Sequence, residues 1–155
     1  MSVFESTIKD LSGIMGFDIE VSPNESCSFE FGDLIITLQY RQAQDDIAIF
    51  SVVTDPEKIL TLSEKMLRAA LSLSYNGTGT GMNYLGLLNE NLVLTNYIPI
   101  EGLSSEDLLQ RIYIFSQSAQ SVHDSLIAMT NQNIKESSSE SSEQNTSDTM
   151  GLMSV

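Results

Sequence analysis

The spacing of apolar residues switches between a helical and a strand period along the chain, and this constrains the fold more than any other feature. Apolar residues recur every three or four positions over residues 3–15, and at every second position in much of residues 27–53. The helical spacing returns from residue 108. The first spacing is typical of a helix with one buried face, and the second of half-buried strands. Because the strands fall in blocks, we expect an α+β fold and not a doubly wound one.

Local signals set the ends of the elements in the first half. Ser2 and Glu5 have the spacing of a capping box, and Gly16 suits the left-handed position after a helix. They predict a helix over Val3–Met15. An antiparallel meander of three strands should follow, over Cys27–Phe31, Leu34–Tyr40 and Asp46–Val53.

The second half predicts a helix, a hairpin and a long helix. Asp55-Pro56 is a typical helix start, and this helix should run to about Ser74. The expected order is α-β-β-β-α-β-β-α, with helices packed on an antiparallel sheet. The remaining elements are strands over Met82–Leu88 and Asn91–Ile98 and a helix from Ser104 to about Thr130.

The last twenty residues differ in composition from the rest. Residues 136–155 contain seven serines, four acidic residues and no Lys or Arg. Such a segment buries too little apolar area to offset its ordering entropy. We therefore predict a folded domain over residues 1–135 and a disordered, Ser-rich acidic tail over residues 136–155.

The charge balance and the scarcity of reactive side chains exclude several function classes. Seven Lys and Arg against 21 Asp and Glu give a formal net charge of −14, which disfavours nucleic acid and anionic membrane as partners. Cys27 is interpreted as a small buried hydrophobe and His123 as a solvated helix residue. No catalytic residue, metal site or cofactor is predicted, so the protein is expected to bind and not to catalyse. The N-terminus lacks the pattern of a signal peptide, and we expect a cytoplasmic protein.

Two segments carry more apolar surface than one core needs. The helix expected over residues 55–74 has an apolar arc about twice the roughly 100° that a surface helix buries. A second copy of the chain would cover the excess, and deep burial within one chain is the alternative. In the sheet, Ile35, Phe50 and Val52 fall on the face opposite the main core. They either form an exposed apolar patch or lie in a sheet covered on both sides.

These patterns together resemble the class I chaperones of bacterial type III secretion, of the CesT/Tir-chaperone family. The resemblance extends over about residues 3–130 and depends on size, acidity and element order. The local patterns are Ile14-Met15-Gly16-Phe17, Cys27-Ser-Phe-Glu-Phe31, Leu60–Leu73 before Asn76-Gly77, Asn91-Leu-Val-Leu94 with Pro99, and the terminal helix from Leu108 to Leu126.

The resemblance implies a bacterial cytoplasmic homodimer that binds the N-terminal segment of a secreted effector. It implies that the chaperone keeps the effector secretion-competent and presents it to the export apparatus and its ATPase. A dimeric interaction adaptor of the same fold, without a secretion role, is the alternative. The dimer contacts that the family resemblance implies are Met66, Ala69, Ala70, Leu73 and Leu85. The effector contacts it implies are Phe4, Ile8, Ile35, Phe50 and Val52.

Overall fold

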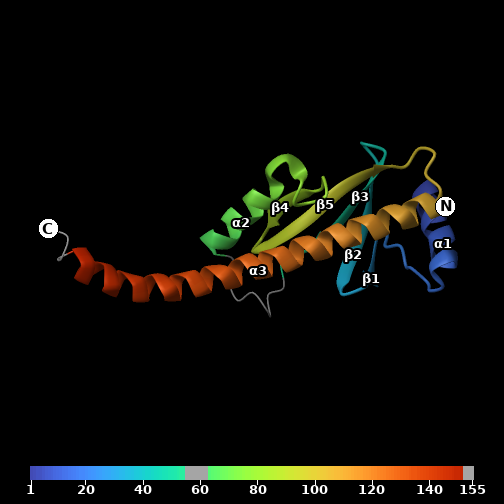
Figure 1. Ribbon diagram of the computed structural model, residues 1–155. Helices are drawn as coiled ribbons and strands as arrows, with labels where there is room; N and C mark the ends of the chain where they lie inside the picture. The colour runs from blue at the N-terminus through green and yellow to red at the C-terminus, as the bar shows by residue number, and fades with distance from the viewer. Residues whose placement is uncertain (55–62, 152–155) are drawn as a thin grey trace.

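The protein is a five-stranded antiparallel sheet with helices on one face (Figure 1). The computed structural model describes the backbone of residues 1–54 and 63–151, and side chains through residue 129. The α+β order expected from the sequence is confirmed. The elements are α1 (Val3–Met15), β1 (Ser26–Phe31), β2 (Leu34–Arg41), β3 (Asp46–Val52), α2 (Glu64–Ser74), the short 3₁₀ helix η1 (Tyr75–Gly77), β4 (Tyr84–Leu88), β5 (Asn91–Pro99) and α3 (Ser105–Gly151).

The strands lie in the order β1-β2-β3-β5-β4. The meander of β1, β2 and β3 is antiparallel, as predicted, with Leu38 opposite Cys27 on one side and Ile49 on the other. The second hairpin joins the sheet through β5, which pairs with β3. As a result β1 and β4 are the two edge strands.

The core lies between the sheet and the helices. In Figure 1, α3 crosses the sheet, with α1 near one end of the sheet and α2 near β4. The helix-facing strand residues alternate with residues on the other face, which no described helix covers; we call this the outer face. The helical spacing expected from residue 108 is confirmed, because six apolar residues of α3, three or four positions apart, form a buried stripe up to residue 126. They are Leu108, Ile112, Phe115, Ala119, Val122 and Leu126.

The predicted helix caps form as expected. The Ser2 hydroxyl accepts a hydrogen bond from the Glu5 backbone N–H at 3.1 Å, and the Glu5 carboxylate accepts one from the Ser2 N–H at 3.2 Å. Gly16 adopts the left-handed conformation with φ of 80°. At the start of α3, the Ser104 hydroxyl accepts a hydrogen bond from the Asp107 N–H at 3.1 Å. These contacts satisfy backbone groups that a helix end leaves free.

The helix predicted from Asp55 to Ser74 is not continuous. Ser63 is extended, with φ −94° and ψ 162°, and its hydroxyl accepts a hydrogen bond from the Met66 N–H at 3.2 Å. The prediction of one helix through Ser63 is therefore wrong, because serine here caps a new helix instead of continuing one. The predicted start at Asp55 lies outside the described residues.

The last helix is longer than predicted. We expected it to end near Thr130, but helical backbone continues to Gly151. Residues 105–150 contain neither Gly nor Pro, and a helix that has already nucleated adds further turns at little cost. The division of the chain at residue 135 stays a prediction.

Candidate functional site

The outer face of the sheet exposes large apolar side chains to solvent. Ile35 is 62% exposed and Val52 45%, while Phe50, two residues before Val52 on β3, is half-buried. Phe50 lies opposite Thr37, so its side chain is on the same face as Ile35. The sheet is thus covered by described helices on one side only, and these three residues form an apolar patch on the open side.

Two of the five expected effector contacts lie elsewhere. Phe4 and Ile8 are 0% exposed and belong to the core between α1 and the sheet. The Phe4 ring stacks on Tyr40 with the ring centroids 6.0 Å apart. In this conformation Phe4 and Ile8 offer no area to a partner, and only Ile35, Phe50 and Val52 are brought together at the surface.

β2 and β3 separate beside this patch. Their pairing ends at Thr37 and Phe50, although β2 begins at Leu34 and β3 runs on to Val52. The Ser51 hydroxyl donates a hydrogen bond to the Ile35 carbonyl oxygen at 2.9 Å. The Ser51 side chain thus takes the place that a backbone donor has in a regular strand pair. The separation opens a cavity of about 820 Å³, which we call the strand gap. Its lining residues are Asp33, Leu34, Ile35, Thr37, Phe50, Ser51, Val52, Thr54, Gln120, His123, Asp124 and Ile127.

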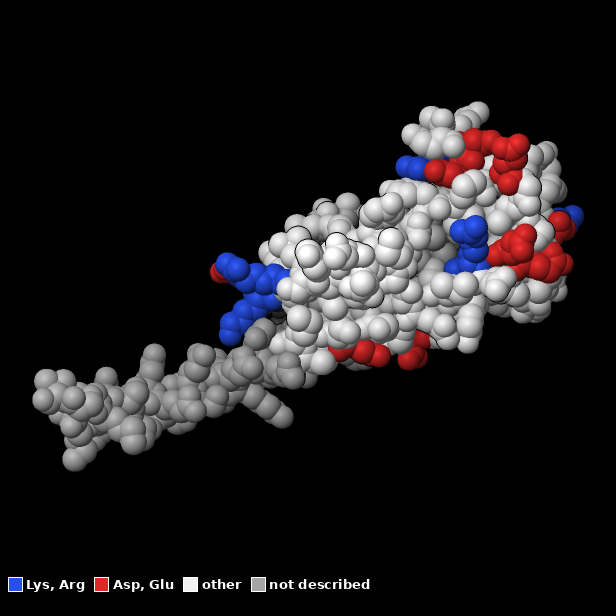
Figure 2. Space-filling view, turned by 45° about the horizontal axis from the view of Figure 1, so that its top comes forward, with Lys and Arg blue, Asp and Glu red and all other residues white. Residues whose placement is uncertain are grey.

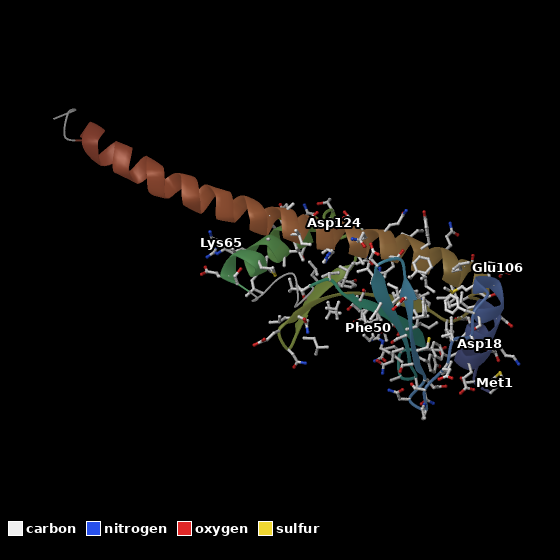
Figure 3. The ribbon with its side chains drawn as sticks, turned by 90° about the horizontal axis from the view of Figure 1, so that it is seen from below. Met1, Asp18, Phe50, Lys65, Glu106 and Asp124 are labelled. Carbon is white, nitrogen blue, oxygen red and sulfur yellow. The ribbon has the colours of Figure 1, made fainter. Side chains whose placement is uncertain are left out.

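α3 forms one wall of the strand gap and brings polar groups to it. His123 Nδ1 lies 2.7 Å from the Val53 carbonyl oxygen, so this nitrogen donates a hydrogen bond to it. The Gln120 amide donates to an Asp124 carboxylate oxygen at 3.0 Å. Figure 3 shows Asp124 on α3 and Phe50 on the sheet.

The structure corrects the interpretation of His123. It is not a solvated residue, because its ring is half-buried and hydrogen-bonded to the backbone at the end of β3.

Cys27 is buried as predicted. Burial raises the pKa of its thiol to about 11, and a hydrogen bond with the Leu38 backbone lowers this pKa by a smaller amount. Such a thiol remains protonated and unreactive at neutral pH.

The expected dimer contacts are mostly core residues of the single chain. Met66, Ala69 and Ala70 are buried, and Leu73 and Leu85 are half-buried against the same core. Other residues of α2, η1 and β4 are exposed instead, with Leu71 at 73%. We call four of them the α2–β4 patch: Leu67, Leu71, Tyr75 and Leu87. A helical period alone does not say which side of a helix the core covers, and the assignment of a dimer surface to α2 stays a prediction.

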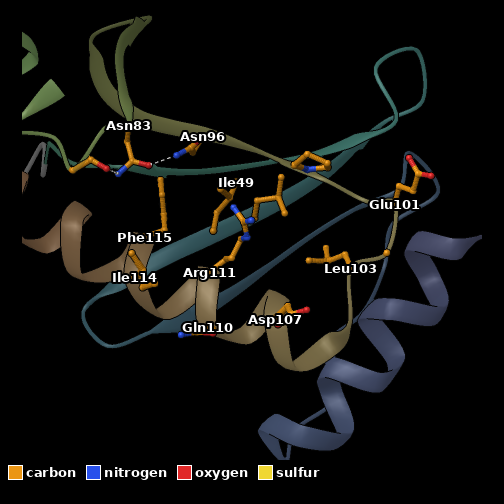
Figure 4. A pocket seen from close by; sticks show the side chains of 14 residues that line it. Ile49, Asn83, Asn96, Glu101, Leu103, Asp107, Gln110, Arg111, Ile114 and Phe115 are labelled. Atoms are coloured by element: carbon orange, nitrogen blue, oxygen red, sulfur yellow. Dashed lines mark hydrogen bonds between the residues drawn. The ribbon is translucent and has the colours of Figure 1, made fainter. Parts of the chain in front are cut away.

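A second cavity of about 610 Å³ lies between α3 and β5 (Figure 4). The Asn96 amide donates to the Asn83 side-chain oxygen at 2.6 Å on its wall, and Arg111 reaches toward Ile49. Glu101 and Asp107 also line it, so that acidic and basic groups are mixed there. No sequence pattern indicates this cavity, because its walls come from segments far apart in the chain.

The charges are distributed unevenly over the surface. Figure 2 shows a broad area without Lys, Arg, Asp or Glu, with charged residues toward its ends and along one side. Among the residues described with side chains, no group of His, Cys, Asp and Glu could hold a metal ion. No described helix is long and apolar enough to cross a bilayer.

Comparison with known proteins identifies the family. Residues 6–122 match the model of the Tir chaperone protein (CesT) family. The chain belongs to this family. That confirms the resemblance found in the sequence, and the family is one of chaperones. No curated protein sequence matches the chain.

Solved structures share the fold at low sequence identity. The HopA1–SchA chaperone–effector complex matches with a TM-score of 0.60 and 17% identity, over 79% of this chain and 94% of that chain. The type III secretion chaperone SycH of Yersinia pestis, in complex with a fragment of YscM2, matches with a TM-score of 0.57 and 14% identity, over 77% and 98%. An uncharacterized protein from Methanothermobacter thermautotrophicus matches with a TM-score of 0.58 and 18% identity, over 79% and 96%. At these identities the likeness shows the fold alone.

Proposed function

We propose that this CesT-family protein is a type III secretion chaperone that binds the N-terminal segment of a secreted effector. The observation that carries the proposal is the exposed apolar patch of Ile35, Phe50 and Val52 on the uncovered face of the sheet. Contiguous apolar surface of this kind marks an interaction site. Family membership and the chaperone–effector complexes of the same fold support the same conclusion.

The client would bind in an extended, largely unfolded form. A sheet accepts extended segments, because alternate side chains of the segment enter pockets while its main chain pairs with exposed backbone. The strand gap provides such a pocket next to Ile35, and β1 and β4 are unpaired edges within the described sheet. A client held in this way stays unfolded, and we infer that it is thereby kept secretion-competent for the export apparatus and its ATPase in the bacterial cytoplasm.

The chaperone would act as a homodimer through the α2–β4 patch. Leu71 is too exposed to contribute to the core of a single chain, and Leu87 on the neighbouring strand is also more than half exposed. Burying them against the same patch of a second copy forms a two-fold interface. The net charge of −14 keeps the remaining apolar surface soluble when no client is bound.

Co-purification tests the proposal directly. The full chain is co-expressed with the first hundred or so residues of each type III effector encoded in the source genome, and complexes are isolated by size exclusion. One segment should co-elute with the wild type and be lost from the Ile35→Asp, Val52→Asp double variant. Ile114→Asp is the matched control, because Ile114 is equally exposed but lies on α3. Absence of any co-eluting segment, or equal recovery with the double variant, would contradict the proposal.

A dimeric adaptor without a secretion role is the second candidate. The uncharacterized protein from Methanothermobacter has the same fold, and a fold does not by itself determine a function. We therefore retain the adaptor as a candidate function. Deleting the gene and measuring effector export separates the two. Loss of one effector from the medium supports the chaperone, whereas unchanged export of every effector supports the adaptor.

A further inference from the structure

We propose that the strand gap selects a client segment that carries a Lys or Arg close to a large aliphatic side chain. This inference depends on the proposed function and adds to it the chemistry of the bound segment. Two features of the gap carry it: the nature of its polar atoms and the place of its apolar wall.

The polar side-chain atoms available on the α3 wall are mainly hydrogen-bond acceptors. His123 uses Nδ1 to donate to the Val53 carbonyl, so this nitrogen offers no hydrogen to a client. The Gln120 amide nitrogen donates to Asp124, which leaves the Gln120 oxygen as a further acceptor. The Asp124 carboxylate has acceptor capacity beyond that single bond. A guanidinium or ammonium group, which has donors only, complements such a wall.

The charge of the gap favours the same choice. Of the described residues that line it, Asp33 and Asp124 are acidic and none is Lys or Arg. The nearest basic residue along β2 is Arg41, and it is already occupied. Arg41 binds the two carboxylate oxygens of Asp46 at 2.6 and 2.7 Å and stacks on Tyr97 at 3.9 Å. A cationic side chain therefore enters a gap whose described charged lining residues are both acidic.

The apolar part of the gap lies immediately beside these acceptors. Its apolar lining residues are Leu34, Ile35, Phe50, Val52 and Ile127. In an extended segment, residues i and i+2 point to the same side, about 7 Å apart. A segment with a cation and a nearby Ile or Leu can therefore offer both groups to the gap, which has acidic and apolar residues in its lining. The negative field of the whole chain would speed the approach of such a segment.

Binding of two designed peptides to the full-length protein tests the inference. The first is a fluorescein-labelled Ser-Gly-Ile-Ser-Arg-Ser-Ile-Gly-Ser, and the second carries Gln in place of Arg. Anisotropy titrations at low salt should show the Arg peptide binding about three- to fivefold more tightly to the wild type, as expected for partly exposed ion pairs. The preference should shrink in 0.5 M salt because salt screens exposed charges.

Protein variants assign the preference to the gap. Asp33→Asn with Asp124→Asn should abolish the Arg preference, because the affinity for the Arg peptide should fall more than the affinity for the Gln peptide. The double variant Glu106→Gln, Glu90→Gln is the control, because it removes the same amount of negative charge outside the gap. Glu106 is at the start of α3, far from Asp124 (Figure 3), and Glu90 is in the β4–β5 turn. The control should retain the preference.

Several outcomes would overturn the inference. Equal binding of the two peptides, no binding of either, or an Arg preference that survives the Asp33 and Asp124 changes would each do so. None of these results bears on whether the longer effector segment co-purifies with the chain, so the inference can fail while the proposed function stands. Conversely, an Arg preference located in the gap would hold even if every effector segment failed to co-elute.

Discussion

His123 on α3 donates a hydrogen bond to the backbone carbonyl of Val53, across 2.7 Å and 70 residues of sequence. The contact ties the last helix to the end of β3 at the point where β2 and β3 have separated. It therefore supports one wall of the strand gap. A histidine that looks like surface in the sequence is in this way part of the framework of the candidate site.

Replacing His123 by Ala should lower the free energy of unfolding by about 1 kcal/mol, because the Val53 carbonyl loses its side-chain partner. Urea denaturation followed by circular dichroism measures the change. Ser121→Ala, on the exposed side of the same helix, is the control and should stay within about 0.5 kcal/mol of the wild type. Equal stability of the two variants would show that the bond contributes nothing.

Met66→Glu and Leu71→Glu should behave differently although both place a charge on α2. Met66 is buried, so its variant should lose several kcal/mol of stability or fail to fold. Leu71 is exposed, so its variant should fold and, if the α2–β4 patch joins two copies, become monomeric. Light scattering after size exclusion measures the mass, with Ile114→Glu as a folded control. A Leu71→Glu protein with the wild-type mass, if that mass is dimeric, would remove the patch from the interface.

Phe4→Ala should act through stability and not through a binding surface. Removing a fully buried phenylalanine ring costs about 3–5 kcal/mol, whereas Ile35→Ser on the outer face should cost little. Thermal unfolding of the two variants checks this order. A Phe4→Ala protein of wild-type stability that fails to bind its client would instead restore Phe4 as a contact residue.

Alkaline pH should weaken the fold through Cys27. Burial raises the pKa of its thiol from 9.0 to about 11, so between these values the unfolded chain loses the proton more readily than the folded chain. Unfolding free energy should therefore fall as pH rises from 9 to 11, by roughly 2–3 kcal/mol from this group. The hydrogen bond to Asp45 raises the pKa of Tyr40 too, which adds a loss in the same direction.

Urea titrations at several pH values compare the wild type with Cys27→Ala. The variant should show a shallower alkaline decline, whatever its stability at pH 7, and the slope that remains should diminish further in a Cys27→Ala, Tyr40→Phe double variant. Identical slopes in the wild type and Cys27→Ala would mean that the thiol does not titrate differently in the two states.

Removing residues 136–155 tests the predicted domain boundary. Because the segment is polar and carries four acidic and no basic residues, we expect the folded domain to keep its thermal midpoint within about 2 °C. Differential scanning fluorimetry of the two chain lengths measures this. A marked fall in the midpoint would place the boundary further along α3.

Much of the fold was predictable because its signals are local. The cap formed by Ser2 and Glu5 involves residues three apart, and the buried stripe on α3 repeats within every two turns. Strand alternation likewise placed Ile35 and Phe50 on the face opposite the core. Such patterns need only the geometry of one element, so the sequence alone determined the order of the elements and the apolar face of most of them.

Only the tertiary structure decided which apolar surfaces stay open. Met66 and Leu71 lie on the same short helix, and the positions of α3 and β4 determine that one is buried and the other exposed. The separation of β2 from β3 and the bond from His123 to Val53 likewise depend on segments that meet only after folding. A periodic pattern shows which residues share a side of a helix or strand, whereas packing over tens of residues determines which side is covered.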